Sequence, residues 1–121
     1  MGLFSKKPQL KTYLFHQAKG FRGFHRYPIV TFGNDTAMKN CDTLANKDLS
    51  DCNIIFKEAK YAQGTYLQVF IDNLQIGSIF KEDQINDMQN GKILDIHVRF
   101  EQENVNFEMR NVARVFAKYE D

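Results

Sequence analysis

The segment KGFRGFHRY, Lys19 to Tyr27, places three basic residues and three aromatic residues within nine positions. Lysine and arginine side chains neutralise phosphates, and aromatic rings stack on nucleobases. This composition is typical of a surface that binds single-stranded nucleic acid. The alternative is the end of a strand and a glycine turn whose phenylalanines belong to the core. The candidate binding residues in this segment are Lys19, Arg22, Phe24, Arg26 and Tyr27.

The same segment nearly matches the sequence signature of the RNA-recognition fold, in which a basic residue, a glycine and alternating aromatics follow one another. Lys19, Gly20 and Phe21 fit the signature, but Arg22 is an extra residue before Gly23. One extra residue in a strand turns every later side chain to the opposite face. The aromatics would then share no stacking platform, so we reject that fold.

No arrangement of residue types in the chain predicts catalysis. Asp95 and Glu101 lie on one face of an expected strand, but six positions separate them by about 20 Å, too far to act on one bond. Cys41 and Cys52 lack the spacing of a zinc finger, and the three histidines are scattered. We therefore expect a non-enzymatic protein with no catalytic residues, no metal and no cofactor.

Length and composition predict one globular domain. The 121 residues suffice for a single core, and 43% of them are hydrophobic. We expect a flexible basic N-terminus over residues 1–10 and one domain over residues 11–121. There is neither an apolar run of about 18 residues nor a secretory signal, so we expect no membrane insertion and a cytoplasmic location, with both cysteines as thiols.

The net charge of +1 conceals an uneven distribution along the chain. Residues 1–31 carry six lysine or arginine side chains and no carboxylate, whereas the remaining residues are acidic overall. Such asymmetry is found in proteins that bind polyanions. Charge alone favours the other interpretation, a solvated basic arm that pairs with the acidic remainder.

Most of the chain has the pattern of β-strands joined by short turns. Hydrophobic residues alternate in 93–102, so that Leu94, Ile96, Val98 and Phe100 face one way. Asp72-Asn73 fits a two-residue hairpin loop, because both residue types tolerate positive φ. The other expected strands span residues 11–17, 27–32, 52–59, 65–72 and 74–80.

Two short helices and a terminal strand complete the expected elements. One helix begins near Asn34 or Asp35, with Met38, Cys41 and Ala45 on one face. A second begins near Glu82 and ends before Gly91. The segment after residue 107 fits both periodicities, and its β-branched and aromatic residues favour a strand that pairs with 93–102. The expected fold is mainly β (α+β): a small antiparallel curled sheet or partly open barrel with one or two short helices.

The order of segments from Asp51 to Val98 resembles a HIRAN domain. CNIIFKEAKY, YLQVFID, NLQIGSIF, KEDQINDMQNG and ILDIHVRF correspond to a strand, a hairpin with an IGxI returning strand, a helix and a final strand. Gly20-Phe21-Arg22 could take the place of the family's first-strand triplet. The resemblance implies binding of single-stranded DNA at its 3′ end through Arg22, Tyr61 and Lys81.

The chain departs from the HIRAN pattern in the turn after the strand ending at Tyr61. The family's Tyr-Asp-x-Asn-Ala run is replaced by Tyr61-Ala62-Gln63-Gly64-Thr65, which lacks the acid that would meet the terminal hydroxyl. We therefore expect little preference for a free 3′ end. Two hypotheses remain: a module that binds single-stranded DNA or RNA, and a protein-interaction or structural domain that binds a protein partner. The sequence defines neither the partner nor the oligomeric state.

Overall fold

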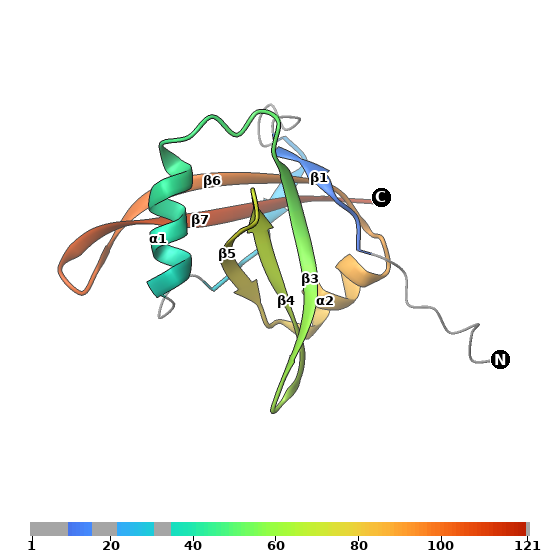
Figure 1. Ribbon diagram of the computed structural model, residues 1–121. Helices are drawn as coiled ribbons and strands as arrows, with labels where there is room; N and C mark the ends of the chain where they lie inside the picture. The colour runs from blue at the N-terminus through green and yellow to red at the C-terminus, as the bar shows by residue number, and fades with distance from the viewer. Residues whose placement is uncertain (1–9, 16–21, 31–34, 121) are drawn as a thin grey trace.

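The computed structural model describes residues 10–15, 22–30 and 35–120. The fold is mainly β, with two helices and two antiparallel sheets that do not close into a barrel. The prediction of a small mainly β domain is confirmed. Figure 1 shows one sheet in front of the long strands of the other, with the two helices on opposite sides of the molecule.

The first sheet has four strands, in the order β1-β3-β4-β5. Alternation of residue types explains its inner face: Leu67, Val69 and Ile71 are buried, whereas the alternating residues Tyr66, Gln68 and Phe70 stay partly exposed. The turn between the last two strands has Asp72 and Asn73 at φ 52° and 64°, as predicted. The strands are β1 (Tyr13–Leu14), β3 (Asn53–Tyr61), β4 (Gly64–Ile71) and β5 (Leu74–Ile79).

The second sheet has three strands, in the order β2-β7-β6. They are β2 (Phe24–Arg26), β6 (Ile93–Val105) and β7 (Glu108–Tyr119). The C-terminal segment is thus a strand that pairs with its predecessor over nearly its whole length, as predicted. Its alternating residues Ala113, Val115 and Ala117 are buried in the core between the two sheets.

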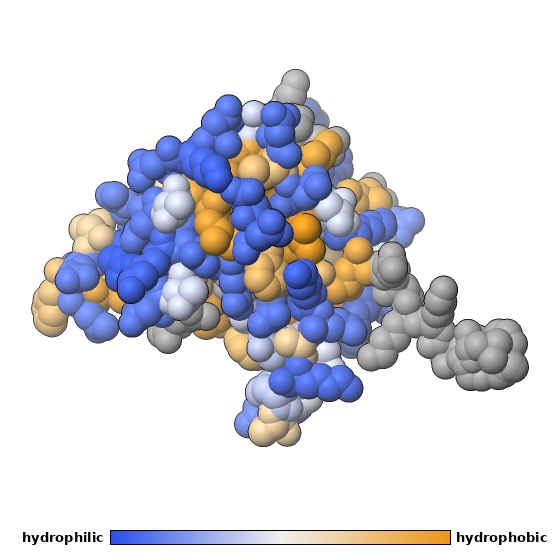
Figure 2. Space-filling model, in the orientation of Figure 1, coloured by the Kyte–Doolittle hydropathy of each residue, from blue (hydrophilic) through white to orange (hydrophobic). Residues whose placement is uncertain are grey.

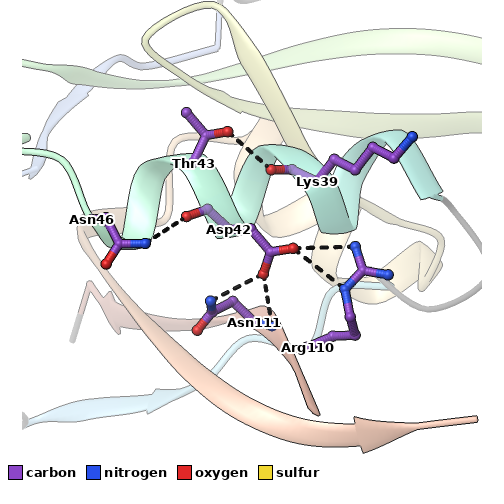
Figure 3. A network of polar contacts seen from close by, with 6 residues as sticks. All are labelled: Lys39, Asp42, Thr43, Asn46, Arg110 and Asn111. Carbon is purple, nitrogen blue, oxygen red and sulfur yellow. Dashed lines mark hydrogen bonds and ion pairs between the residues drawn. The ribbon is translucent and has the colours of Figure 1, made fainter. Parts of the chain in front are cut away.

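Helix α1 (Asp35–Ala45) covers β5 and β7. It buries Met38, Cys41 and Leu44, while Ala45 is exposed, so the expectation that Ala45 shares the buried face is wrong. The helical repeat of 3.6 residues places Leu44, three positions after Cys41, on that face instead. In Figure 3 the Asp42 carboxylate points from α1 towards Arg110 and Asn111 of β7.

Helix α2 (Glu82–Gln89) follows β5, as the sequence predicts. Glu82 and Asp83 lie in its first turn, where carboxylates interact favourably with the helix dipole. Ile85 and Met88 are buried, and Gly91 beyond the helix has φ 71°, a conformation that glycine adopts without strain.

Three predictions about strands need correction. The segment 27–32 is not a strand in its described part: Val30 alone forms a bridge to Ser78, and residues 31 and 32 lie outside the described residues. The strand expected at 11–17 is reduced to β1, with residues 16 and 17 also outside. Leu94 is 50% exposed, because an irregularity in the β6–β7 pairing between Ile93 and Asp95 shifts the alternation and buries Ile93 instead.

Candidate nucleic-acid interface

Of the predicted residues near the N-terminus, Phe24 and Arg26 belong to β2 in the second sheet, and Arg22 and Tyr27 flank that strand. Arg22 and Arg26 are exposed, while Phe24 is half-buried with its ring edge-on to His97 at 6.3 Å between centroids. Lys19 lies outside the described residues. This part of the predicted surface therefore offers two exposed arginines and little ring surface for stacking.

Tyr27 was expected to stack on a base, and that expectation is wrong. Its side chain is 0% exposed, and its hydroxyl donates a hydrogen bond to the carbonyl oxygen of Gln84 in α2. Its backbone N–H donates to the carbonyl of Val115 at 2.8 Å. Burial raises the pKa of its hydroxyl well above the ordinary value of a tyrosine. Tyr27 is a core residue that joins the segment after β2 to β7 and α2.

Tyr61, the candidate from the HIRAN resemblance, belongs to a cluster of three rings. It lies at the end of β3 and makes edge-to-face contacts with Tyr66 and with Phe80, each at 5.5 Å between centroids. Tyr66 and Phe80 are stacked at 5.1 Å with an interplanar angle of 16°. Tyr61 is 40% exposed and Phe80 43% exposed, so two of the rings are partly open to solvent. We call Tyr61, Tyr66 and Phe80 the aromatic cluster.

The geometry of the strands explains why these rings meet. Side chains two positions apart in a strand share a face, and directly paired residues of neighbouring strands also share one. Ala59 pairs with Tyr66, which places Tyr61, two positions further along β3, on the same outer face as Tyr66. Phe80 directly follows β5, whose Ile79 pairs with the buried Leu67 and therefore faces inward. Phe80 points outward, beside Tyr66.

A hollow of 580 Å³ lies between the aromatic cluster and α2. We call it the α2 groove. Tyr61 and Phe80 form its apolar wall, and polar side chains of the β3–β4 turn and of α2 form the rest. Amide groups dominate this polar wall, and each amide offers both hydrogen-bond donors and an acceptor. The amides are those of Gln63, Asn86, Gln89 and Asn90.

The charges around the α2 groove do not favour phosphate inside it. Glu58 and Glu82 line the groove, and Glu58 accepts a hydrogen bond from the side-chain amide of Gln89. Among the residues that the structure describes, the lining includes no lysine or arginine. Lys60 and Lys81, both exposed, are the sequence neighbours of Tyr61 and Phe80, and neither lines the groove. An entering ligand would thus meet rings and amides first and cations at the margin.

Beyond the aromatic cluster, the outer face of the first sheet continues with aromatic and polar side chains. The ammonium group of Lys57 lies 4.9 Å from the centre of the Phe70 ring, and the Gln68 amide donates to the Tyr66 hydroxyl at 3.4 Å. Figure 2 shows apolar residues near the middle of the molecule in this view, interrupted by polar ones. The face is therefore mixed in character rather than one continuous apolar patch.

The structure does not bring the predicted site residues into one place. Arg22 precedes β2 in the second sheet, whereas Tyr61 ends β3 in the first. In Figure 1 the β3–β4 turn projects at the bottom, well away from the long strands with which β2 is associated. Lys81 is the only predicted cation that adjoins the aromatic cluster among the residues described.

Sequence reasoning missed Tyr66 and Phe80. Tyr66 could have been found, because the alternation of 65–72 places it on the face opposite Leu67 and hence on the side open to solvent. The contribution of α2 to the groove depends on how that helix packs against β4, which no local pattern encodes.

Comparison of the chain with protein-family models, curated proteins and solved structures gives no match. The resemblance to the HIRAN domain therefore remains a prediction from the sequence. Within the described part of the chain, neither helix has the length and apolar character needed to cross a membrane.

Proposed function

We propose that this domain is a non-enzymatic module that binds single-stranded nucleic acid through the aromatic cluster and the α2 groove. The observation that carries the proposal is the pair of exposed rings, Tyr61 and Phe80, beside a groove with a wall of amides. Single-strand binding proteins stack successive bases on such rings, and each stacked base contributes about 1–3 kcal/mol. The HIRAN resemblance independently points to Tyr61 and Lys81.

Two bases of a flexible strand would stack on Tyr61 and Phe80. Amides such as those of Gln63 and Asn86 would meet the hydrogen-bonding edge of a base that enters the α2 groove. Bases in a duplex are stacked and paired, so neither their faces nor their edges are available to this site. The module should therefore prefer single strands to duplexes of the same sequence.

In binding of this kind, contacts to the bases contribute more free energy than contacts to the phosphates. Lys60 and Lys81 are sequence neighbours of Tyr61 and Phe80, and the carboxylates of Glu58 and Glu82 repel phosphate from the groove itself. Each neutralised phosphate adds about 0.7 to the log–log salt slope of single-strand binding. The slope should lie near that of one or two phosphates. Lys81→Ala should flatten it, whereas Arg22→Ala, on the other sheet, should leave it unchanged.

The experiment is fluorescence anisotropy of a short labelled single-stranded oligonucleotide titrated with the full chain. Tyr61→Ala should weaken binding by about 1–3 kcal/mol, roughly 5- to 150-fold in Kd, without changing the salt slope. Tyr61→Phe is the matched control, because it keeps the stacking ring and should retain most of the affinity. Circular dichroism of each variant checks that the fold persists.

Absence of binding by the unmodified chain at about 50 mM salt, where electrostatic attraction is strong, would overturn the proposal. The protein-interaction alternative would then account for the exposed rings, since tyrosine and phenylalanine are enriched at protein interfaces. We also place the protein in the cytoplasm, a proposal supported by its two free thiols, Cys41 and Cys52.

A further inference from the structure

Strand β6 forms an edge of the second sheet. It runs from Ile93 to Val105, 13 residues, and in the sheet order β2-β7-β6 its one neighbour among the described strands is β7. Strands of globular proteins are usually about 5–6 residues long. An edge strand presents a row of backbone donors and acceptors that another strand can pair with. The length of β6 makes that row unusually long.

An open hollow of 390 Å³ adjoins this strand. Its apolar walls come from Phe15, from Leu44 and Leu49 at and after the end of α1, and from Phe100 of β6. A cavity of about 150 Å³ is sufficient to hold a benzene ring. The hollow beside β6 therefore has room for an aromatic side chain brought by a strand that pairs with β6.

The sequence of β6 is complementary to itself when two copies run antiparallel. If the two-fold axis passes through Phe100, the Arg99 of each copy lies directly opposite the partner's Glu101. Both residues extend from the same face of the strand, and within one chain they already form an ion pair at 2.5 Å. Opposite charges that face each other across paired strands stabilise the pairing.

The neighbouring registers are unfavourable by the same criterion. A two-fold axis at residue 99 places Arg99 opposite Arg99 of the partner subunit. An axis at residue 101 places Glu101 opposite the partner's Glu101, although it also places Arg99 opposite the partner's Glu103. Like charges directly opposite each other destabilise a strand pair. A shift of the pairing by one residue would place the inner-face side chains of one β6 opposite the outer-face side chains of the other β6. Of these three registers, the one through Phe100 places opposite charges beside the axis and places no like charges directly opposite each other.

The same register covers two exposed apolar side chains. Phe107 at the β6–β7 turn is 99% exposed, and Leu94 near the start of β6 is 50% exposed. Antiparallel pairing through Phe100 brings the turn of each copy to the beginning of the partner's β6. Each Phe107 then lies close to the partner's Leu94, and both lose contact with water.

From these features we propose that the protein forms a symmetric dimer by antiparallel pairing of β6 with the β6 of a second copy, with the two-fold axis at Phe100. The two three-stranded sheets join into one of six strands. Phe100 of each copy meets its counterpart at the hollow bounded by Leu44 and Leu49. This interface uses the second sheet, so it is independent of the proposed nucleic-acid site on the first.

The test is the association state of the full chain, measured by sedimentation equilibrium at low salt over a range of concentrations. Arg99→Glu places a carboxylate directly opposite the partner's Glu101. This happens once on each side of the two-fold axis. We expect it to raise the dimer Kd by roughly 10- to 100-fold. The monomer should still fold, because residue 99 pairs directly with Arg114 in β7 and the new carboxylate faces that guanidinium.

A charge exchange provides the decisive comparison. The double variant Arg99→Glu with Glu101→Arg restores opposite charges across the axis and should return the Kd to near its original value. Lys39→Glu makes the same change in net charge on the exposed side of α1 and should leave the Kd unchanged. Circular dichroism confirms folding of each variant.

Each remaining outcome overturns the proposal. A chain that is monomeric at every concentration removes the dimer. Equal dissociation of the Arg99→Glu and Lys39→Glu variants would show an effect of net charge rather than of β6. Failure of the double variant to associate, while it folds, would show that the register through Phe100 is wrong.

Discussion

The carboxylate of Asp42 in α1 accepts hydrogen bonds from both the backbone N–H and the side-chain amide of Asn111 in β7, at 3.1 and 3.0 Å (Figure 3). Its other oxygen accepts from the guanidinium of Arg110, at 3.2 Å from Nη2. Desolvation works to raise the pKa of Asp42, but these hydrogen bonds and the charge of Arg110 outweigh it. The pKa of Asp42 is therefore lowered, and the network stabilises the attachment of α1 to the second sheet.

The lowered pKa predicts a specific dependence of stability on pH. Because the folded pKa lies below the unfolded value of about 3.9, the stabilisation is fully present above that value and is lost as pH falls through the folded pKa. Asp42→Asn, which removes the charge, should lower the free energy of unfolding at pH 7 by about 1 kcal/mol, discounted for the exposure of the pair. This deficit should disappear in acid. Urea unfolding of both proteins at a series of pH values measures it.

Asp51→Asn is the matched control, since Asp51 is an exposed aspartate in the turn before β3. It should be nearly as stable as the unmodified protein at every pH. A deficit for Asp42→Asn that stays constant from neutral pH into acid would show that the loss comes from packing rather than from the charge of Asp42.

A second prediction distinguishes the two hydrophobic residues that the sequence alternation treats alike. Ile96 is fully buried, whereas Leu94 is half exposed beside the irregularity at the start of β6. Ile96→Ala should lower the free energy of unfolding by about 2–5 kcal/mol, and Leu94→Ala by about 0.5 kcal/mol or less. Both are measured by urea unfolding at low protein concentration in the Arg99→Glu background, where the proposed dimer contact of Leu94 is weakened. Equal losses would mean that the register change at Ile93 is incorrect.

Leu94 also shows how far the sequence alone could be taken. Alternation correctly predicts β4, most of β6 and the strand character of β7, because burial of one face imposes a period of two. An irregularity in strand pairing shifts that period, and the residue types do not show where it occurs. The alternation therefore predicts that Leu94 is buried, whereas the structure buries Ile93. The prediction that Tyr27 stacks on a base was wrong for a related reason. Its ring is amphipathic, and whether it stacks on a ligand or packs in the core depends on contacts with α2 and β7 that are remote in sequence.

The candidate site was predicted only in part, for the same physical reason. Tyr61 and Lys81 were predicted from the HIRAN resemblance, which depends on an order of local elements that the structure reproduces. Arg22 was predicted from the same resemblance and from the basic composition, and neither says in which of two sheets a short strand such as β2 takes its place.

The third prediction concerns two turns with nearly the same backbone and different residues. Asp72-Asn73 has φ 52° and 64°, and Asn106-Phe107 has φ 52° and 68°. Asparagine tolerates this left-handed conformation, but a phenylalanine there bears a steric cost of about 1–2 kcal/mol between Cβ and the backbone. Glycine removes that steric cost. Its greater conformational freedom in the unfolded chain opposes folding by about 0.5–1 kcal/mol. Phe107→Gly should therefore stabilise the monomer by about 0.5–1 kcal/mol, and Asn73→Gly should be close to neutral.

Urea unfolding in the Arg99→Glu background measures both changes without a contribution from association. The side chain of Asn104 accepts a hydrogen bond from the N–H of Phe107 at 2.9 Å, and glycine keeps that N–H, so the turn itself is preserved. A loss of stability in Phe107→Gly would show that the ring of Phe107 is held by contacts within its own chain, which its exposure argues against. In the unmodified background the same substitution should weaken the proposed dimer, because the partner's Leu94 is uncovered. Phe107→Gly would then stabilise the fold and reduce association, opposite effects that a purely structural role of Phe107 does not predict.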